Sequence, residues 1–252
     1  MTGYETRFAG VGSLLGKESL ERLKNAHFLV IGLGGVGTWA VESLVRSGLG
    51  KLTLVDLDDI CVSNTNRQLH AHEGNYGKMK AEALAERVKL INPECEVEII
   101  LSYFNKKNAD EILSKKYSMV VDGIDSIDEK TILLNLCYRK GLKVVTAGAA
   151  GGKTDPTKIT VAEITKTKQD KLIKAIKKKL RREFNYPLGN GKAKVKCVYS
   201  FEPSKKIKTC DVTNSTKLDC SGGLGTSTYM TGTFGFLLSY IAIDEFLKTK
   251  TS

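Results

Sequence analysis

Short apolar segments alternate with longer amphipathic segments along the first 147 residues of the chain. The short segments are rich in Val, Ile and Leu, which is typical of buried strands, and in the longer ones apolar residues recur every three or four positions, as on one face of a helix. We expect strands at residues 28–31, 52–56, 97–101, 118–122 and 143–147, and helices at residues 19–25, 38–47, 78–91, 109–113 and 128–140. This alternation predicts an α/β fold with a doubly wound, mainly parallel, Rossmann-like sheet and a ligand site at the carboxyl ends of the strands.

The pattern changes after residue 147. Strands are expected at residues 159–164 and 195–201, an amphipathic helix with a lysine-rich polar face at residues 170–183, and a terminal helix from about residue 229 to residue 248. The sequence therefore predicts a basic C-terminal α+β extension, and no linker separates it from the first part of the chain.

A glycine-rich turn follows the first expected strand. Its glycines are Gly32, Gly34, Gly35 and Gly37, and a helical pattern begins directly after them. Glycine lets the backbone approach a phosphate closely, and the unpaired amides at a helix start offer donors and partial positive charge. Asp56 ends the next strand, at the place where a ribose-hydroxyl acceptor belongs in a nucleotide-binding βαβ unit. We expect a nucleotide ligand here, although a turn of this kind also serves strand–helix packing.

Charged residues follow the other expected strands. Arg67 lies in the loop after the second strand, Lys78 and Lys80 open the next helix, and Asp122 and Asp125 follow the fourth strand. Cations and carboxylates at one sheet edge suit phosphates with Mg²⁺ better than they suit a redox dinucleotide. For Asp122 an alternative is open, in which its side chain only caps the following turn.

The positive charge of the chain is concentrated in one region. The formal net charge is +11, and residues 166–208 contain 15 Lys or Arg against three acidic residues, while the rest of the chain holds 24 basic and 25 acidic residues. A local excess of this kind favours a nucleic acid partner. The alternative is a solvated helix face with basic loops.

Cysteine placement and hydropathy exclude several protein classes. The six cysteines contain no Cys-x-x-Cys pair, so neither a zinc site nor a disulfide framework is indicated, and a reducing cytoplasm fits best. Residues 221–243 carry no charge, but five glycines and nine Ser, Thr or Tyr residues favour a buried helix over a membrane span. The first 16 residues lack the pattern of a secretory signal. We expect a cytoplasmic protein without stable membrane insertion.

Five separate elements carry a resemblance to a known family. They are Gly32-x-Gly34-Gly35-x-Gly37, Asp56, Asn64-x-x-Arg67-Gln68, Lys80 and Asp125, in this order. The set resembles the ubiquitin-activating-enzyme-like (ThiF/MoeB/HesA) family of adenylating enzymes. Residues 155–157, 169–170, 197–202, 219–225 and 233–236 further resemble one branch of that family, the enzymes that dehydrate threonylcarbamoyladenosine in tRNA.

The resemblance implies a specific ATP-dependent cyclisation. The carboxylate of the threonylcarbamoyl group attacks the α-phosphate of ATP and releases pyrophosphate, and the acyl adenylate then closes to a ring and expels AMP. It further implies that residues 1–165 form an ATP-binding adenylation region and residues 166–252 a basic extension with the terminal helix, both within a single domain.

The resemblance also implies the roles of single residues. The glycines hold the phosphates, Asp56 holds the ribose hydroxyls and Asp125 binds Mg²⁺. The implied ATP-binding set is Gly32, Gly34, Gly35, Gly37, Asp56, Asn64, Arg67, Gln68, Lys80 and Asp125. The expected catalytic residues are Arg67, Lys80 and Asp125, with Cys220 as a further candidate, although ring closure within one substrate requires no enzyme thioester.

The expected partners are a tRNA and a second copy of the chain. The tRNA contacts are expected at Lys171, Lys174, Lys178, Arg181 and Arg182. A homodimer follows from the resemblance, and relatives bring an arginine of the partner subunit into the site, for which Arg7 lies in the right region. A monovalent cation near residues 219–225 and a sulfur-transfer partner of the cysteine desulfurase type stay open.

Three other functions stay open on sequence grounds. The first is an adenylyltransferase that activates the C-terminus of a small sulfur-carrier protein, but its members commonly hold zinc with two Cys-x-x-Cys pairs, which this chain lacks. The second is a nicotinamide-dependent dehydrogenase, in which Arg67, Lys80 and Asp125 have no evident task. The third is a non-catalytic tRNA-binding protein that has kept the nucleotide fold.

Overall fold

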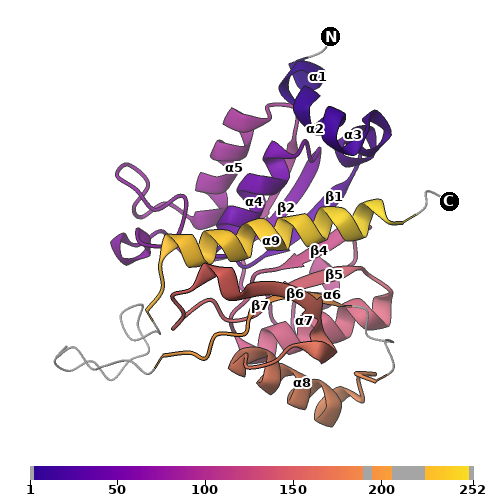
Figure 1. Cartoon of the computed structure of the whole chain (residues 1–252). Coiled ribbons are helices and arrows are strands. Elements are labelled where there is room, and N and C mark those ends of the chain that lie inside the picture. The colour runs from indigo at the N-terminus through magenta and orange to yellow at the C-terminus, as the bar shows by residue number, and fades with distance from the viewer. Residues whose placement is uncertain (1–2, 190–194, 206–224, 250–252) are drawn as a thin grey trace.

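In the computed structural model, which describes residues 3–189, 195–205 and 225–249, seven strands form one mainly parallel sheet (Figure 1). The order is β3-β2-β1-β4-β5-β7-β6, and only β6 and β7 pair antiparallel among these neighbours. The strands are β1 His27–Ile31, β2 Lys51–Val55, β3 Glu96–Ile100, β4 Met119–Asp122, β5 Val144–Ala147, β6 Ile159–Glu163 and β7 Lys196–Ser200. Each predicted strand is found within one residue of its expected bounds, and the predicted α/β fold is confirmed.

Helices cover both faces of the sheet. They are α1 Gly3–Arg7, α2 Ala9–Leu15, α3 Lys17–Lys24, α4 Gly37–Arg46, α5 Lys80–Ile91, α6 Ala109–Ile112, α7 Ile127–Lys140, α8 Lys171–Phe184 and α9 Thr228–Leu247, with 3-10 turns at Val62–Asn64, Pro156–Lys158 and Ile164–Lys166. Every predicted helix is present within two residues of its expected bounds. Helices α1 and α2 were not expected, because each spans about two turns or less and α2 contains two glycines. Packing of Tyr4 and Phe8 against Leu20 holds them.

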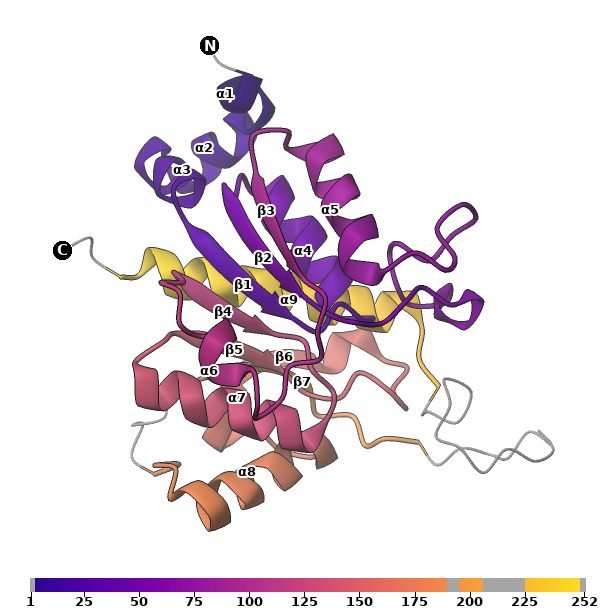
Figure 2. The same ribbon diagram turned by 180° about the vertical axis from the view of Figure 1, so that it is seen from behind.

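Alternate side chains of the central strands enter two different cores. Phe28 and Val30 of β1 pack with α4, α5 and α9 on one face, which Figure 1 shows with α9 crossing in front. Leu29 and Ile31 pack with α6, α7 and α8 on the other face, seen from behind in Figure 2. Because side chains alternate along a strand, a sheet covered on both faces requires these continuously apolar strands.

Helix α9 is apolar on most of its surface because it packs both on the sheet and against α4. Phe234 and Leu238 are fully buried. At Gly235 a Cβ atom would lie only 2.5 Å from the Trp39 Cβ and 2.6 Å from the Val36 carbonyl oxygen, so the two helices approach to backbone contact. Within the described residues, no helix combines the length and apolar character needed to cross a membrane.

Strand β6 lies just before the expected C-terminal extension and β7 lies within it, yet both belong to the same sheet as β1–β5. Strand β7 pairs parallel with β5, with Thr146 opposite Cys197. Strand β6 then pairs antiparallel with β7 and forms the edge. The carboxyl ends of β1, β2, β4, β5 and β7 therefore lie along one edge of the sheet, which is where the predicted site residues are found.

Candidate active site

Two glycines of the turn after β1 are required by the fold itself. Gly32 has a φ of +85°, and a Cβ atom there would lie 2.8 Å from the carbonyl carbon of Gly123 in the loop after β4. A Cβ atom at Gly37 would lie 1.9 Å from the Gly32 carbonyl oxygen. At Gly34, by contrast, a Cβ atom would have no described neighbour within 4 Å, so the backbone borders open space. Gly32 and Gly37 thus serve close packing, and the exposed backbone near Gly34 is the part of the turn that a phosphate can approach.

Asp56 lies directly beside this turn. Its Oδ2 accepts a hydrogen bond from the Leu33 amide at 2.7 Å, and its Oδ1 accepts one from the Asp58 amide at 2.9 Å. Burial raises the pKa of Asp56, although these backbone donors act in the opposite direction. The carboxylate therefore fixes the turn after β1 against the end of β2. In a nucleotide-binding fold, a ribose and its phosphates would meet at this turn and this strand end.

The loop around Arg67 is shaped by its own polar side chains. Asn64 is buried, and its Oδ1 accepts the Cys61 amide at 3.1 Å. The Arg67 Nη1 donates to the Ser63 carbonyl at 2.8 Å, which leaves the guanidinium half-buried at the rim of the site. Gln68 is buried, and its Oε1 has no hydrogen-bond partner among the described residues. Arg67 is thus available to a ligand, whereas Asn64 shapes the turn and Gln68 holds a free acceptor.

Helices α4 and α9 anchor this loop from positions distant in sequence. The Arg67 carbonyl accepts hydrogen bonds from the Trp39 Nε1 and the Thr231 Oγ1, each at 3.1 Å. The Asn66 Nδ2 donates to the Thr226 carbonyl at 3.0 Å. The anchors at Thr226 and Thr231 were not predicted, because no local pattern links this loop to residues more than 150 positions later.

Lys80 begins α5 and is paired with an acid that no sequence motif singled out. Its Nζ lies 2.6 Å from the Asp58 Oδ2, and its side chain is only 7% exposed. The Tyr103 hydroxyl donates to the Asp58 Oδ1 at 2.6 Å. Burial alone would raise the pKa of Asp58, but the hydrogen bonds from Lys80 and Tyr103 outweigh it, so the pKa lies below its usual value. The spacing Asp56-x-Asp58 after a strand was the available signal for this residue.

The two acidic residues after β4 have different environments. Asp122 is fully buried in an ion pair, with its Oδ2 2.7 Å from the Lys130 Nζ, and it also accepts the Thr146 hydroxyl at 2.6 Å and the Ile124 amide at 3.0 Å. The last contact is the turn-capping alternative considered for this residue. Asp125 is exposed in the same loop. Because Gly123 packs against Gly32, this loop borders the glycine turn, and Asp125 is an exposed carboxylate in it.

A row of cations lies on the outer face of α8. Ile173, Ile176 and Leu180 bury the inner face. The exposed cations are Lys171, Lys174, Lys178, Arg181 and Arg182. Spacings of three and four residues place them on one side of the helix. The structure thus brings together the five residues predicted to contact tRNA.

The other two lysines of α8 are engaged within the protein. The Lys177 Nζ donates to the Thr167 carbonyl at 3.0 Å, and the Lys179 ammonium pairs with Asp128 of α7. They are only partly exposed. The helix therefore separates its cations into an internal set and an outward set.

A buried ion pair attaches the start of α8 to the loop after β5. The Lys153 Nζ lies 3.3 Å from the Asp170 Oδ2, and both side chains are 1% exposed. The Asp170 Oδ1 caps α8 by accepting the Ile173 amide at 3.0 Å. The first turn of α8 is in this way held at the carboxyl edge of the sheet.

The remaining sequence candidates lie elsewhere or outside the described residues. Cys220 and most of residues 219–225 are outside them, as are Lys206 and Lys208. Arg7 donates to the Ile91 carbonyl at 3.0 Å, at the end of α5 opposite to Lys80. Since α5 is about 18 Å long by its rise per residue, Arg7 lies far from the candidate site of the same chain.

Three of the four described cysteines show no sign of nucleophilic activation. Cys95, Cys137 and Cys197 are buried, and burial raises the pKa of each thiol, that of Cys95 to about 12. Among the described residues, no group of three or more His, Cys, Asp or Glu side chains is arranged to hold a metal ion.

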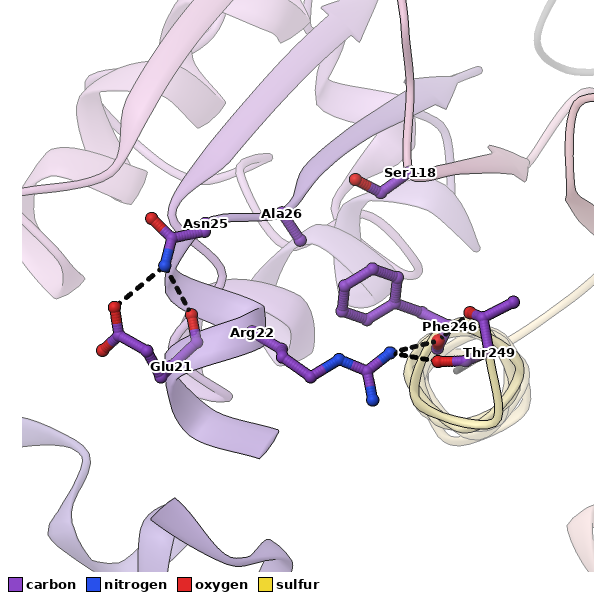
Figure 3. Close-up of a pocket in the computed structure, with 7 residues that line it drawn as sticks. All are labelled: Glu21, Arg22, Asn25, Ala26, Ser118, Phe246 and Thr249. Carbon is purple, nitrogen blue, oxygen red and sulfur yellow. Dashed lines mark hydrogen bonds between the residues drawn. The ribbon is translucent and has the colours of Figure 1, made fainter. Parts of the chain in front are cut away.

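Two pockets lie at the opposite, amino edge of the sheet. One, of about 440 Å³, is shown in Figure 3, where Arg22 reaches across it to the end of α9. Its guanidinium donates to the Phe246, Leu247 and Thr249 carbonyls, which caps that helix. The other, of about 450 Å³, is lined by Tyr138 and Tyr186 among others. Neither pocket contains a predicted ATP-site residue, so the candidate site is an open edge and not one of these pockets.

Comparison with known proteins identifies the family. The ThiF family model matches residues 8–250. The chain is 44% identical to the tRNA threonylcarbamoyladenosine dehydratase of Haemophilus influenzae over 98% of its length and 96% of that protein's. It is 38% identical to the crystal structure of the Escherichia coli tRNA N6-threonylcarbamoyladenosine dehydratase, TcdA, in complex with ATP, with a TM-score of 0.87 over 98% of this chain and 96% of that one.

A relative with a different activity matches a smaller part of the chain. The probable molybdopterin-synthase adenylyltransferase of Gracilaria tenuistipitata is 35% identical over 55% of this chain and 38% of that protein. A match of this extent is what a shared adenylating fold alone would give. The family match across nearly the whole sequence, together with the sheet edge described above, shows that this chain is a member of the ThiF family.

Proposed function

We propose that the chain binds ATP with Mg²⁺ at the carboxyl edge of the sheet and uses it to dehydrate N6-threonylcarbamoyladenosine in tRNA to the cyclic form. The single observation that carries this proposal is the match to tRNA threonylcarbamoyladenosine dehydratases over 98% of the chain. The match includes the basic region, which a nucleotide-binding fold alone does not require. Residues 1–165 then hold ATP, and residues 166–252 add the substrate-binding surface within the same domain.

The charged groups at the edge suit attack at the α-phosphate. A substrate carboxylate oxygen bonds to the α-phosphorus as pyrophosphate leaves, and a carbamoyl nitrogen or oxygen then bonds to the activated acyl carbon as AMP leaves with the former carboxylate oxygen. Two anions must meet in the first step, so fixed positive charge lowers the barrier. Arg67 and Lys80 would supply it, and the open backbone at Gly34 would border the phosphates. Asp125 would hold Mg²⁺, which would add further positive charge.

The outward cations of α8 form the proposed tRNA contact. They begin beside the carboxyl edge, because Asp170 ties the first turn of α8 to the loop after β5. A helix of 14 residues extends about 20 Å, so the row can follow several phosphates away from the site. Binding through phosphates is dependent on salt and carries little sequence information by itself.

The decisive experiment combines the protein with ATP, Mg²⁺ and threonylcarbamoylated tRNA, followed by nucleoside mass spectrometry. We expect a product that is one water lighter and an equal yield of AMP. Arg67→Ala and Lys80→Ala should each lower the rate about a hundredfold, in the range that loss of one charge-stabilising donor causes. Lys107→Ala, a change of an exposed lysine after β3, serves as the control with an unchanged rate. Absence of the lighter nucleoside from folded, ATP-binding protein would disprove the proposal.

The main alternative is activation of a sulfur-carrier protein. The partial match to a molybdopterin-synthase adenylyltransferase supports this alternative. Pyrophosphate exchange separates the two activities. Exchange that requires threonylcarbamoylated tRNA supports the dehydratase, and exchange that requires a carrier protein supports the alternative. Full tRNA modification by both Arg67→Ala and Lys80→Ala would instead favour a non-catalytic tRNA-binding role.

We further propose a cytoplasmic homodimer. Arg7 lies at the amino edge of its own subunit, so an arginine from this segment can act in a site only when the partner subunit supplies it. Light scattering of the purified chain tests the dimer, and Arg7→Ala tests the contribution across it. A monovalent cation and a sulfur-transfer partner belong to the same proposal, and dependence of the rate on K⁺ and copurification with a cysteine desulfurase are their respective tests.

A further inference from the structure

Asp58 stands out among the residues at the site because no part of the proposed function uses it. It lies two residues after Asp56, on the segment that leaves β2, and its carboxylate is half-exposed. Each of its oxygens has one partner, Lys80 at Oδ2 and the Tyr103 hydroxyl at Oδ1, both at 2.6 Å. An acidic residue beside a phosphate site opposes the anion, so its presence requires a reason.

The backbone around Asp58 and Lys80 is joined before their side chains meet. The Lys80 amide donates to the Asp58 carbonyl at 3.0 Å, and Asp59 forms a β-bridge with Met79. The Ile60 amide donates to the Lys78 carbonyl at 2.9 Å. Three consecutive residues on each segment are therefore held in register, which fixes the base of the Lys80 side chain.

The side-chain contact then fixes its tip. Without a partner, a four-carbon side chain has several rotamers, and ordering it costs free energy. The Lys80 side chain is only 7% exposed, so few positions of the ammonium are open to it, and Asp58 selects one of them. An ammonium has three donors, and Asp58 uses one, which leaves two for phosphate oxygens.

We propose that Asp58 is a positioning residue, which holds the Lys80 ammonium at the place where ATP phosphates bind. Tyr103 keeps the Asp58 carboxylate oriented by bonding the oxygen that Lys80 does not use. The hydrogen bond to Asp58 raises the pKa of Tyr103 to about 12, so this hydroxyl remains a donor at neutral pH. The inference rests on the proposed function only for the role of Lys80 toward phosphate.

A double-mutant cycle on ATP affinity tests the inference without tRNA. The four proteins are wild type, Asp58→Asn, Lys80→Met and the double variant, with Mg·ATP binding measured by calorimetry. We expect Asp58→Asn to weaken binding between about threefold and tenfold when Lys80 is present, and to weaken it no further when Met replaces Lys80, since coupled residues are not additive.

Simple electrostatics gives the opposite sign. If Asp58 only repels phosphate, its neutralisation strengthens ATP binding in both backgrounds, and that result would overturn the inference. Equal weakening in both backgrounds would also overturn it, because a general structural role does not depend on Lys80. Asp59→Asn removes the same charge from the neighbouring exposed residue, and we expect it to leave ATP affinity within about twofold of wild type.

The two proposals fail in distinguishable ways. If wild-type protein gives no dehydrated nucleoside but the cycle shows coupling, the proposed function is wrong and the role of Asp58 stands. If the nucleoside forms and Asp58→Asn shows no coupling to Lys80, the reverse holds. Urea unfolding of all four proteins confirms that each is folded at the temperature of the binding experiment.

Discussion

The two halves of the carboxyl edge use lysine–aspartate pairs in different ways. Beyond β4 and β5 the pairs Asp122–Lys130 and Asp170–Lys153 are closed, with every side chain at most 1% exposed. Beyond β2, Lys80 is covered but its partner Asp58 is 44% exposed. A closed pair cannot exchange a partner for a ligand, whereas an open pair borders the space where a ligand enters. The closed half therefore fixes loops, and the open half is the part suited to chemistry.

Loss of one member of a closed pair is the most severe way to test this difference. Lys130→Met leaves the Asp122 carboxylate buried without its cation, and we expect the free energy of unfolding to fall by about 3–5 kcal/mol. Replacing both partners, in Asp122→Asn with Lys130→Met, should recover most of that loss because no charge then remains buried. Urea denaturation measures both.

The same helix provides the control for Lys130. Lys140 of α7 pairs with Asp110 at 2.9 Å, but the Asp110 side chain is 76% exposed. Lys140→Met should change the free energy of unfolding by about 1 kcal/mol or less. If the two lysine variants lose similar stability, the Asp122–Lys130 pair is not a closed structural element as described.

These lysine–aspartate pairs were not predicted from the sequence, although the elements that carry them were. Apolar periodicity located the strands, because burial on both faces demands a pattern that is visible locally. The glycine turn, Asp56, Arg67 and Lys80 were placed near one edge, because parallel strands present their carboxyl ends together. The structure adds which of these groups are paired within the protein and which border open space.

Contacts between distant segments could not be predicted from the sequence. The sequence placed Asp122 and Asp125 near the same edge, but it did not show that Lys130 pairs with Asp122 in the core while Asp125 is exposed. The link of the Arg67 carbonyl to Thr231 spans most of the chain. Such partners are set by the packing of α7 and α9 on the sheet, which a local pattern does not contain.

Acid titration tests a buried group of the open half. His70 is 1% exposed, and its Nε2 lies 3.2 Å from the Leu33 carbonyl of the glycine turn. Because Leu33 offers an acceptor there, Nε2 must carry the proton, and burial lowers the pKa of His70 from 6.5 to about 4. Between these pH values the unfolded chain binds a proton that the folded chain does not, so stability falls as the pH is lowered from about 6.5 to about 4.

By this linkage, His70 lowers the free energy of unfolding by about 3 kcal/mol in total over this pH range. In His70→Asn the part of the pH dependence due to this residue should disappear, while His72→Asn, at an exposed neighbour, should retain the wild-type profile. Urea midpoints at pH 7, 6, 5 and 4 provide the measurement. An unchanged slope in His70→Asn would mean that the pKa of His70 is the same in the folded and the unfolded protein.

The smallest expected effect concerns the outer surface of the closed half, where α8 presents its free cations. Lys174→Gln with Lys178→Gln removes two outward charges, and Lys177→Gln with Lys179→Gln removes two that are bonded internally. Only unpaired cations are free to contact tRNA phosphates and release counterions. The Lys174→Gln, Lys178→Gln variant should therefore weaken tRNA binding about threefold to tenfold and reduce the slope of log affinity against log salt by about 1.5. The Lys177→Gln, Lys179→Gln variant should change that slope by less than half as much.

Fluorescence anisotropy with labelled tRNA at several salt concentrations compares these two variants, which carry equal net charge on one helix. Equal slopes would show that the net charge of α8, and not the separation of its cations into two sets, determines RNA binding.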